Sequence, residues 1–240
     1  MGASSRHQEF YDYWYNSSHT LDPKTPPYKQ SLGGPKARLP VHPLGVSGNE
    51  LVITESYNKM YYRLLYLRKT GTPGSGAVIT GQPGIGAYST TKSPPHATTH
   101  RCICCSGKTL FLNYLLTRLV LANQAVLLST APTLYLFFRG TVYRQDGVDF
   151  SDIPTHRWDQ TSTMWTLIDS DAPPRPPTIE QESFIWPIQV SPPNPTQWGV
   201  WSRKRKAAVL GLPLWDVNEL LLGYALAASC MAGSSLTVLC

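Results

Sequence analysis

Two groups of residues have the chemistry of a phosphate-binding loop but lie apart in the chain. The first is "GQPGIG", which follows the apolar run "AVIT"; the second is "KT", which precedes the run "LFLNYLLTRLVL". Glycines let successive backbone N–H groups turn toward one anion, a lysine reaches the β- and γ-phosphates, and a threonine hydroxyl holds Mg²⁺. Joined directly, the halves read G-x-x-x-x-G-K-T between a strand and a helix, the Walker A pattern. The sequence therefore predicts ATP and Mg²⁺ as ligands, with a nucleotide-binding set of Gly81, Gln82, Pro83, Gly84, Ile85, Gly86, Lys108 and Thr109.

A second motif, which is acidic, also indicates a site for Mg²⁺ and phosphate. In "WTLIDSD" an apolar run ends at Asp169, the shape of a Walker B strand. We expect its carboxylate to organise the Mg²⁺ shell together with the Thr109 hydroxyl. Many such sites carry a glutamate directly after the aspartate to activate water, but Ser170 stands there and Asp171 is the nearest acid. The group that would activate water is therefore in doubt.

The 21 residues 87–107 separate the two halves of the predicted loop. They hold three of the five cysteines and are rich in Thr, Ser and Pro. Two explanations stay open: a retained in-frame intron, since codons at both junctions can supply splice signals, or a genuine surface loop. Closing such a loop costs only about 3 kcal/mol of entropy, so the fold can tolerate it. An insert at this joint would place chain where phosphates should lie, so we expect an impaired nucleotide site.

The hydrophobic pattern predicts an α/β fold. Apolar runs at 77–80, 125–129, 164–169 and 183–190 predict strands, and "TVYR" is strand-like. Helices are predicted at "TESYNKMYYRLLYLRK", capped by Thr54 or Ser56, and from about Lys108; "TLYLFFRG" is read as a short helix ended by Gly140. Pro187 suggests a bulge or an edge position for its strand. Strands alternating with helices favour a largely parallel sheet with helices on both faces.

Composition divides the chain into three parts. Residues 1–48 are aromatic and Pro-rich, with a short helix expected within 1–20; residues 49–223 hold the motifs; residues 224–240 are uncharged and apolar. The formal charge of +6 falls to +2 without the four basic residues 203–206 (+6 − 4). That run is read as a solvated helix end, with nucleic-acid contact or nuclear import as alternatives.

The termini and cysteines give weaker indications. No secretory signal is seen, so a cytoplasmic or nuclear location is expected. The uncharged stretch 220–240 is long enough to span a bilayer, although a buried end is the preferred interpretation. The spacing of His96, His100, Cys102 and Cys105 fits no common zinc pattern, and an odd cysteine count favours reduced thiols.

From about Val52 to Gly223 the chain resembles the P-loop NTPase region of fungal Crinkler/retrotransposon-hot-spot (RHS)-type proteins. The resemblance rests on "VITGQPGIG", "KTLFLNYLL", "YLFFRGTVYR", "WTLIDSD", "SPPNPTQW" with Trp201, and "GLPLWDVNEL". It implies an ATP-binding domain of the ASCE type, in which Ser191 lies near the position of a γ-phosphate-sensing polar residue. It also implies a further C-terminal region, so the domain is expected to be truncated here.

Three functional hypotheses follow. The first is an ATP-binding NTPase-type domain that the insert impairs, with a nucleotide as its partner. The second is a non-catalytic pseudo-NTPase that binds an unknown protein partner. The third, a membrane-tethered protein held by residues 220–240, is the least favoured.

Overall fold

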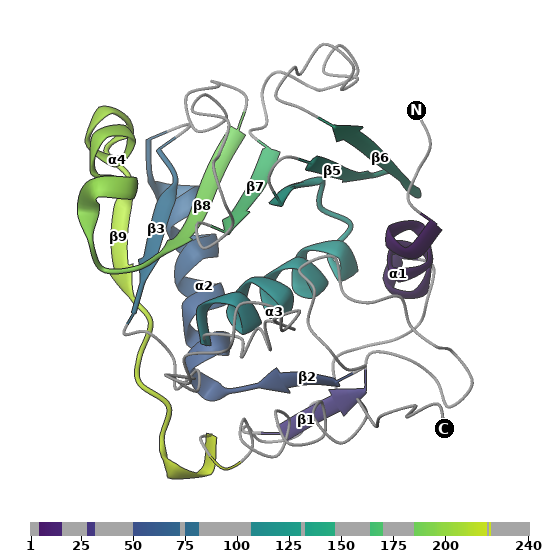
Figure 1. Cartoon of the computed structure of the whole chain (residues 1–240), viewed down its shortest axis with the longest axis horizontal. Coiled ribbons are helices and arrows are strands. Elements are labelled where there is room, and N and C mark those ends of the chain that lie inside the picture. Colours follow the sequence, from purple (N-terminus) through teal and green to yellow (C-terminus); the bar gives the residue numbers. More distant parts are fainter. Residues whose placement is uncertain are drawn as a thin grey trace, which may run out of the picture.

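The computed structural model describes residues 5–15, 28–31, 50–72, 75–81, 107–130, 133–146, 164–169, 185–219 and 221. They form an α/β fold with a seven-stranded sheet of order β6-β5-β4-β7-β8-β3-β9 and a two-stranded sheet β1-β2 (Figure 1). The elements are α1 (Ser5–Tyr15), β1 (Tyr28–Ser31), β2 (Glu50–Ile53), α2 (Glu55–Thr70), β3 (Ala77–Thr80), α3 (Gly107–Leu121), β4 (Val126–Thr130), β5 (Thr133–Phe138), β6 (Thr141–Asp146), β7 (Met164–Asp169), β8 (Ile185–Ser191), a 3₁₀ helix (Pro195–Gln197), α4 (Gly199–Arg205) and β9 (Ala208–Gly211).

The centre of the large sheet is parallel, as predicted. Strands β4, β7, β8, β3 and β9 run in one direction, while β5 and β6 extend the sheet as an antiparallel hairpin. Every residue of β8 is buried, and β7 is buried up to its last residue. Strands that are buried on both faces read as continuous apolar runs, which explains why the sequence revealed them.

Helices lie on both faces of the sheet. On one face, Arg68 of α2 stacks over Trp165 of β7 at 4.3 Å from the ring centroid, and α3 shares this core. On the other face, Trp201 of α4 donates to the Gln189 side chain of β8 at 2.6 Å. Gln189 alternates with the Ile188 and Val190 side chains of the first face. The crossover β3-α3-β4 runs one way along the sheet and β8-α4-β9 runs the other, so right-handed connections place the two helices on opposite faces.

The helix α3 is the centre of the main core. Leu112, Leu115, Leu116 and Leu119, which share one face of this predicted helix, are fully buried, and so is most of the rest of the helix. It contacts α1, α2, β2 and the strands β4, β7 and β8 (Figure 1). A helix that is apolar on nearly all sides is stable in a protein interior. This explains why α3 is buried even on the faces that a surface helix would expose to solvent.

The helix α1, predicted within residues 1–20, docks on the hairpin β5-β6. The Gln8 amide donates to the Gly140 carbonyl at 2.9 Å and accepts from the Val142 N–H at 2.8 Å. Its aromatic residues Phe10, Tyr11 and Trp14 are buried in the same core as α3. The helix therefore covers the end of α3 on the hairpin side (Figure 1).

The prediction of a short helix in "TLYLFFRG" is wrong, because these residues form β5 and a turn. Arg139 and Gly140 have φ values of 48° and 81° and form a two-residue connection to β6. Two left-handed residues between paired strands match a type I′ turn, whose twist suits a hairpin. A short continuous apolar run is ambiguous between helix and strand, and Gly140 is a turn residue rather than a helix end.

The prediction of an edge or bulge at Pro187 is also wrong, since β8 lies between β7 and β3. The pairing of β3 with β8 begins only at Ala77 and Ile188, one residue beyond the proline. At that point Gly76 has φ +86°, and a Cβ there would lie 2.6 Å from the Pro187 carbonyl oxygen and 2.8 Å from its ring. A glycine without a side chain thus makes room for the proline in a central strand.

We predict that Gly76→Ala lowers the free energy of unfolding by about 1–3 kcal/mol, because alanine resists this φ and collides with Pro187. Urea denaturation monitored by tryptophan fluorescence measures the loss. Gly211→Ala is the matched control, since nothing lies within 4 Å of its added Cβ and its φ is ordinary. An equal effect of the two substitutions would contradict the account of Pro187.

A second prediction concerns the pH dependence of α1 docking. The His7 ring stacks on Tyr135 at 3.8 Å, and burial together with the Arg144 charge lowers the pKa of His7 to about 4. Because the pKa of His7 is lower in the folded state, its contribution to the free energy of unfolding is complete above pH 6.5. This contribution is lost as the pH falls toward 4. Because His7 is only half-buried, we expect a loss of about 1–2 kcal/mol over this window.

The reference for this measurement is His7→Phe, which keeps a stacked ring but does not titrate. Unfolding free energies of the two proteins at pH 7 and pH 4 isolate the contribution of His7 from that of the carboxylates. A difference between the proteins that does not change with pH would show that His7 is not buried as described.

Candidate functional site

The predicted site residues gather at the carboxyl ends of three adjacent strands. Gly81 follows β3, Ser191 ends β8 and Asp169 ends β7. Thr80 pairs with Ser191, and Asp169 pairs with Val190, so these strand ends lie level with one another. Because parallel strands end at the same edge, the sheet places an aspartate, a fully buried serine and the first glycine of the predicted loop side by side.

This edge is also the switch point of the sheet. The connection that leaves β3 runs toward β4, whereas the connection that leaves β8 runs the other way to β9. Because α3 and α4 lie on opposite faces of the sheet, the two connections leave the adjacent ends of β3 and β8, at Gly81 and Ser191, toward opposite faces. In open α/β sheets ligands bind in the crevice at this point.

Lys108, in the first turn of α3, lies at the same edge. A Cβ on Gly81 would be 3.9 Å from the Lys108 Cγ, although 26 residues separate the two positions (108 − 82). Lys108 is only 3% exposed, and it forms no ion pair with any carboxylate in the described part of the chain. A lysine side chain at the start of a helix, without a carboxylate beside it, suits a bound anion.

The segment after β9 covers this edge. The Leu212 N–H donates to the Thr80 carbonyl at 2.6 Å, and Leu212 also lies 3.4 Å from a Cβ placed on Gly81. Further on, the Trp215 ring lies 3.4–3.6 Å from a Cβ placed on Gly107, the first residue of α3. Both glycines at this edge therefore leave space that a side chain would fill.

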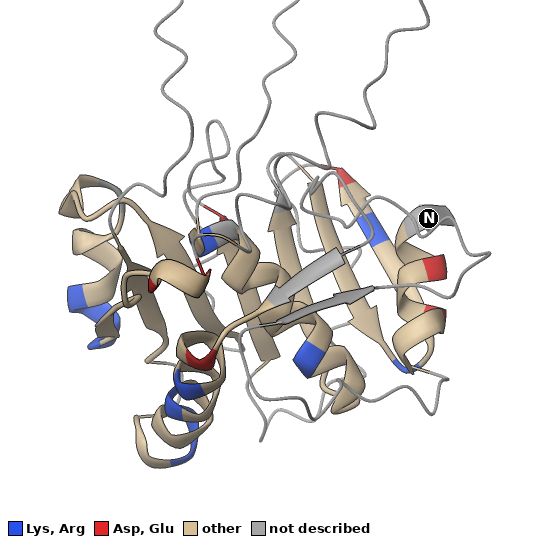
Figure 2. Cartoon of the chain, turned by 90° about the horizontal axis from the view of Figure 1, so that it is seen from below, with Lys and Arg blue, Asp and Glu red and all other residues tan. Residues whose placement is uncertain are grey.

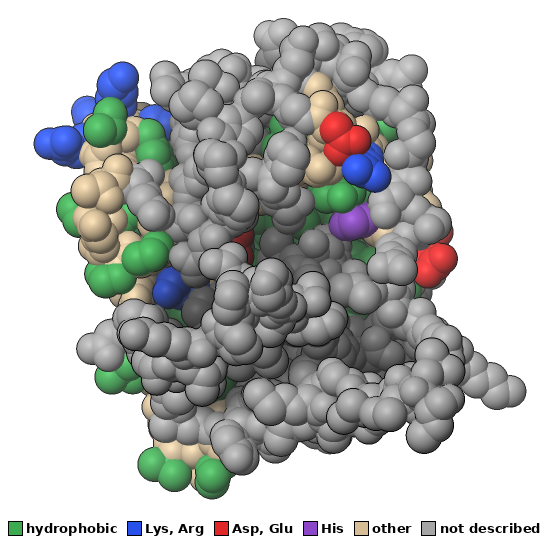
Figure 3. Space-filling view, viewed as in Figure 1, with side chains coloured by type: hydrophobic (Ala, Val, Ile, Leu, Met, Phe, Trp, Pro, Cys, Tyr) green, Lys and Arg blue, Asp and Glu red, His purple; other side chains and the backbone are tan. Residues whose placement is uncertain are grey.

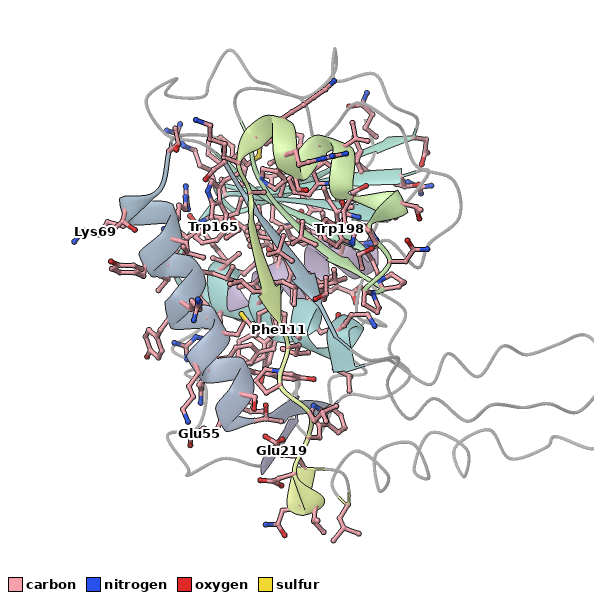
Figure 4. All side chains as sticks on the ribbon, turned by 90° about the vertical axis from the view of Figure 1, so that its left-hand side faces the viewer. Glu55, Lys69, Phe111, Trp165, Trp198 and Glu219 are labelled. Atoms are coloured by element: carbon pink, nitrogen blue, oxygen red, sulfur yellow. The ribbon has the colours of Figure 1, made fainter. Side chains whose placement is uncertain are left out.

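An acidic capping box fixes the covering segment. The Asp216 carboxylate accepts from the Glu219 N–H at 2.8 Å, and the Glu219 carboxylate accepts from the Asp216 N–H at 3.0 Å. Glu219 is 4% exposed and also bonds the side chain of Thr54, the residue that caps α2 by accepting from the Tyr57 N–H. Figure 4 shows Glu219 at the same end of α2 as Glu55. Burial raises the pKa of Glu219, and the Asp216 N–H partly offsets that rise.

Tyr57 joins α2 to the start of α3. Its hydroxyl donates to the Gly107 carbonyl at 2.7 Å, and its ring makes edge contacts with Phe111 and Trp215 (Phe111 is labelled in Figure 4). In the sequence, Tyr57 belongs only to a predicted helix and Trp215 only to the motif "GLPLWDVNEL". Nothing in their spacing indicates that they meet at residue 107, because the contact spans three elements.

Several predicted residues lie outside the described part of the chain. The loop residues Gln82, Pro83, Gly84, Ile85 and Gly86 are among them, as are Asp171 and all of the insert 87–107 except Gly107. Thr109 is described as part of α3, but not its side chain. The structure thus brings together Gly81, Lys108, Asp169 and Ser191 at one edge and does not test the remaining residues.

The other candidates are placed as follows. The basic run ends α4, where Arg203, Lys204 and Lys206 are exposed and Arg205 donates to the Ile185 carbonyl at 2.7 Å. The residues His96, His100, Cys102 and Cys105 lie outside the described ranges, within which no cluster of three or more metal-ligating residues occurs. Among the helices that the structure describes, none is both long and apolar enough to span a bilayer.

Comparisons of the chain with protein-family models, with curated proteins and with solved structures found no match. The resemblance to Crinkler/RHS-type proteins therefore stays a prediction from the motifs quoted above.

We predict that Tyr57→Phe destabilises the fold by about 1 kcal/mol, because the Gly107 carbonyl loses a partly buried hydrogen bond. Chemical denaturation measures the change. Tyr66→Phe serves as the control, since Tyr66 lies on the same helix and is 65% exposed. A Tyr57→Phe protein as stable as the control would mean that this hydrogen bond does not position α3.

Proposed function

We propose that this chain is an ATP-binding domain of the P-loop NTPase type whose nucleotide site is weakened by residues 87–107. The observation that carries the proposal is the approach of Gly81 to Lys108 at the carboxyl edge of the parallel sheet. The two motif halves, far apart in sequence, thereby occupy the strand end and helix start that a Walker A loop connects.

The strand order supports the ASCE type. In that type a further strand separates the phosphate-loop strand from the Walker B strand. Here β8 lies between β3, which leads into the predicted loop, and β7, which ends at Asp169. Ser191 at the end of β8 then lies between the loop and the acid, a suitable position for a side chain that contacts the terminal phosphate.

The residues at this edge fit Mg-ATP. Lys108 would hold the β- and γ-phosphates, since it is a buried cation without a carboxylate partner in the described residues. The first N–H groups of α3 would add their partial positive charge. Asp169 and Thr109 would hold Mg²⁺, which supplies charge neutralisation at the phosphates when bound. Trp215 and Leu212, packed over the two glycines, would limit the access of water.

The insert acts on the loop rather than on the fold. Gly107 immediately precedes Lys108 in this chain, and removing residues 87–107 would put Gly86 in its place. The carbonyl that accepts from Tyr57 would then still belong to a glycine, so α3 keeps its anchor. What changes is whether the N–H groups of residues 84–86 are contiguous with those of α3, which an anion nest requires.

We predict that a protein lacking residues 87–107 binds Mg-ATP at micromolar to sub-millimolar Kd, and that the full chain binds at least about tenfold more weakly. A tenfold change corresponds to about 1.4 kcal/mol, a modest requirement for a restored anion site. Lys108→Ala in the shortened protein should abolish the gain. Titration of fluorescent ATP measures the affinities, and thermal melts confirm that each protein is folded.

Equal affinity of the full and shortened chains for Mg-ATP would contradict the split-loop interpretation. Absence of binding by either folded protein would overturn the proposal of an ATP site.

A further prediction separates the metal from the phosphates. Asp169→Asn in the shortened protein should reduce Mg²⁺-dependent ATP hydrolysis by at least about tenfold while changing metal-free nucleotide binding less than twofold, because the carboxylate acts through the metal. Phosphate release and nucleotide titration in EDTA measure the two quantities. If both fall equally, Asp169 has a structural role only.

A non-catalytic domain is the second candidate. It is favoured by Ser170, which occupies the position where a water-activating glutamate is expected. The same assays distinguish it, because a pseudo-NTPase binds Mg-ATP in the shortened protein but releases no phosphate.

A further inference from the structure

A groove on the side of the sheet away from α1 is not used by the proposed nucleotide site. It has a volume of about 680 Å³ and is lined by the 3₁₀ helix, α4 and β9. Its lining residues are Pro195, Thr196, Trp198, Gly199, Val200, Ser202, Arg203, Lys206, Ala207 and Val209. Large apolar side chains are exposed here, since Val200 is 62% and Val209 51% exposed.

The groove adjoins a free strand edge. The strand β9 is the last in the sheet, and among the strands that the structure describes it pairs with β3 alone. The N–H groups of Ala208 and Leu212 donate toward β3, so by alternation the backbone N–H and C=O groups of Val209 and Gly211 point outward. No described residue bonds these outward groups, and nothing lies within 4 Å of a Cβ on Gly211.

The charge at the groove has one sign. Arg203 and Lys206 line it, Lys204 and Arg205 are adjacent, and none of the described lining residues carries a carboxylate. Figure 2 marks basic residues at this end of α4, and Figure 3 shows basic side chains there next to apolar ones. A second copy of the chain would bring the same positive charge against this edge, which opposes self-pairing.

We propose that this surface binds an extended acidic peptide, which adds a strand to the outer edge of β9. Backbone hydrogen bonds to Val209 and Gly211 would align the peptide, and apolar side chains on one of its faces would enter the groove beside Trp198, Val200 and Val209. Flanking Asp or Glu residues would meet Arg203 and Lys206. An edge, an apolar groove and a basic rim are the three parts that strand addition with acidic specificity requires.

The probe is the fluorescein-labelled peptide Asp-Glu-Val-Thr-Val-Thr-Asp-Glu. One comparison peptide replaces its acids with Lys and Arg. The other keeps the acids and carries N-methyl groups on its four central residues. In fluorescence anisotropy with the full chain, the acidic peptide should bind at least tenfold more tightly than either comparison peptide. Loss of binding on N-methylation reports backbone pairing, which a purely electrostatic contact would not need.

The variant for this surface is Arg203→Gln combined with Lys206→Asn. Asparagine is chosen because residue 206 has φ 55°, a conformation that asparagine tolerates. The double variant should weaken binding of the acidic peptide at least fivefold, whereas Lys69→Asn, an exposed lysine at the end of α2 (labelled in Figure 4), should leave it unchanged. The N-methyl comparison needs no variant, so it remains decisive if the double variant is unstable.

Three outcomes overturn the proposal: no binding of the acidic peptide, equal binding of all three peptides, or an equal effect of the double variant and Lys69→Asn. A ten-nucleotide oligothymidylate is titrated in parallel. If it binds through Arg203 and Lys206 more tightly than the acidic peptide, the surface is a nucleic-acid site and the peptide proposal is wrong.

Discussion

The burial of α3 against the sheet is the interaction on which the rest of the structure depends. This helix packs beneath β4, β7 and β8 and is itself covered by α1, α2 and β2. Because it is apolar on nearly every side, it is most stable in a position where nearly all of its surface leaves water. That position fixes its first turn at the carboxyl edge of the sheet.

The location of Lys108 follows from this packing. A lysine in the first turn of a helix buried in this way cannot extend freely into solvent, and it lies against the end of β3 at Gly81. The Tyr57 hydroxyl holds the same turn from the side of α2, and Trp215 closes it from the segment after β9. The position of Lys108 beside Gly81 is therefore a consequence of how the core is assembled, although 26 residues separate the two in the sequence.

On the opposite face of the sheet, a buried hydrogen bond holds α4 in place. The Gln189 side chain is fully buried in the middle of β8 and accepts from Trp201 of α4. This bond ties the short helix α4 to the central strands, while Arg203, Lys204 and Lys206 at its basic end stay exposed. The sheet thus presents two distinct surfaces: a closed carboxyl edge for the proposed nucleotide and an open outer edge at β9.

The sequence predicted those parts of the fold that depend on local pattern. Continuous apolar runs located β3, β4, β7 and β8, and of the two predicted caps, Thr54 and Ser56, it is Thr54 that caps α2. Local pattern failed at Gly140, where a left-handed turn joins two strands, and at Pro187, where the missing side chain of Gly76 makes room for the ring. These outcomes depend on which distant residue packs opposite, which periodicity does not encode.

In the candidate site, too, the sequence predicted the residues with a local motif but not those that arrive from distant segments. The residue types at Gly81, Lys108 and Asp169 indicated phosphate chemistry before their positions were known, since that chemistry needs glycine, a cation and an acid. The covering residues Leu212 and Trp215 could not be predicted, because they reach the edge only after the chain has crossed the sheet to β9.

The most direct test of the proposed site is a ¹⁵N amide spectrum of the protein lacking residues 87–107, titrated with Mg-ATP. The account predicts that the amides of Gly81, Lys108 and Ser191 shift together with a single Kd, while the amide of Gly140, in the distant hairpin, does not move. Saturable nucleotide binding that leaves these three amides unchanged would contradict the location of the site at the carboxyl edge.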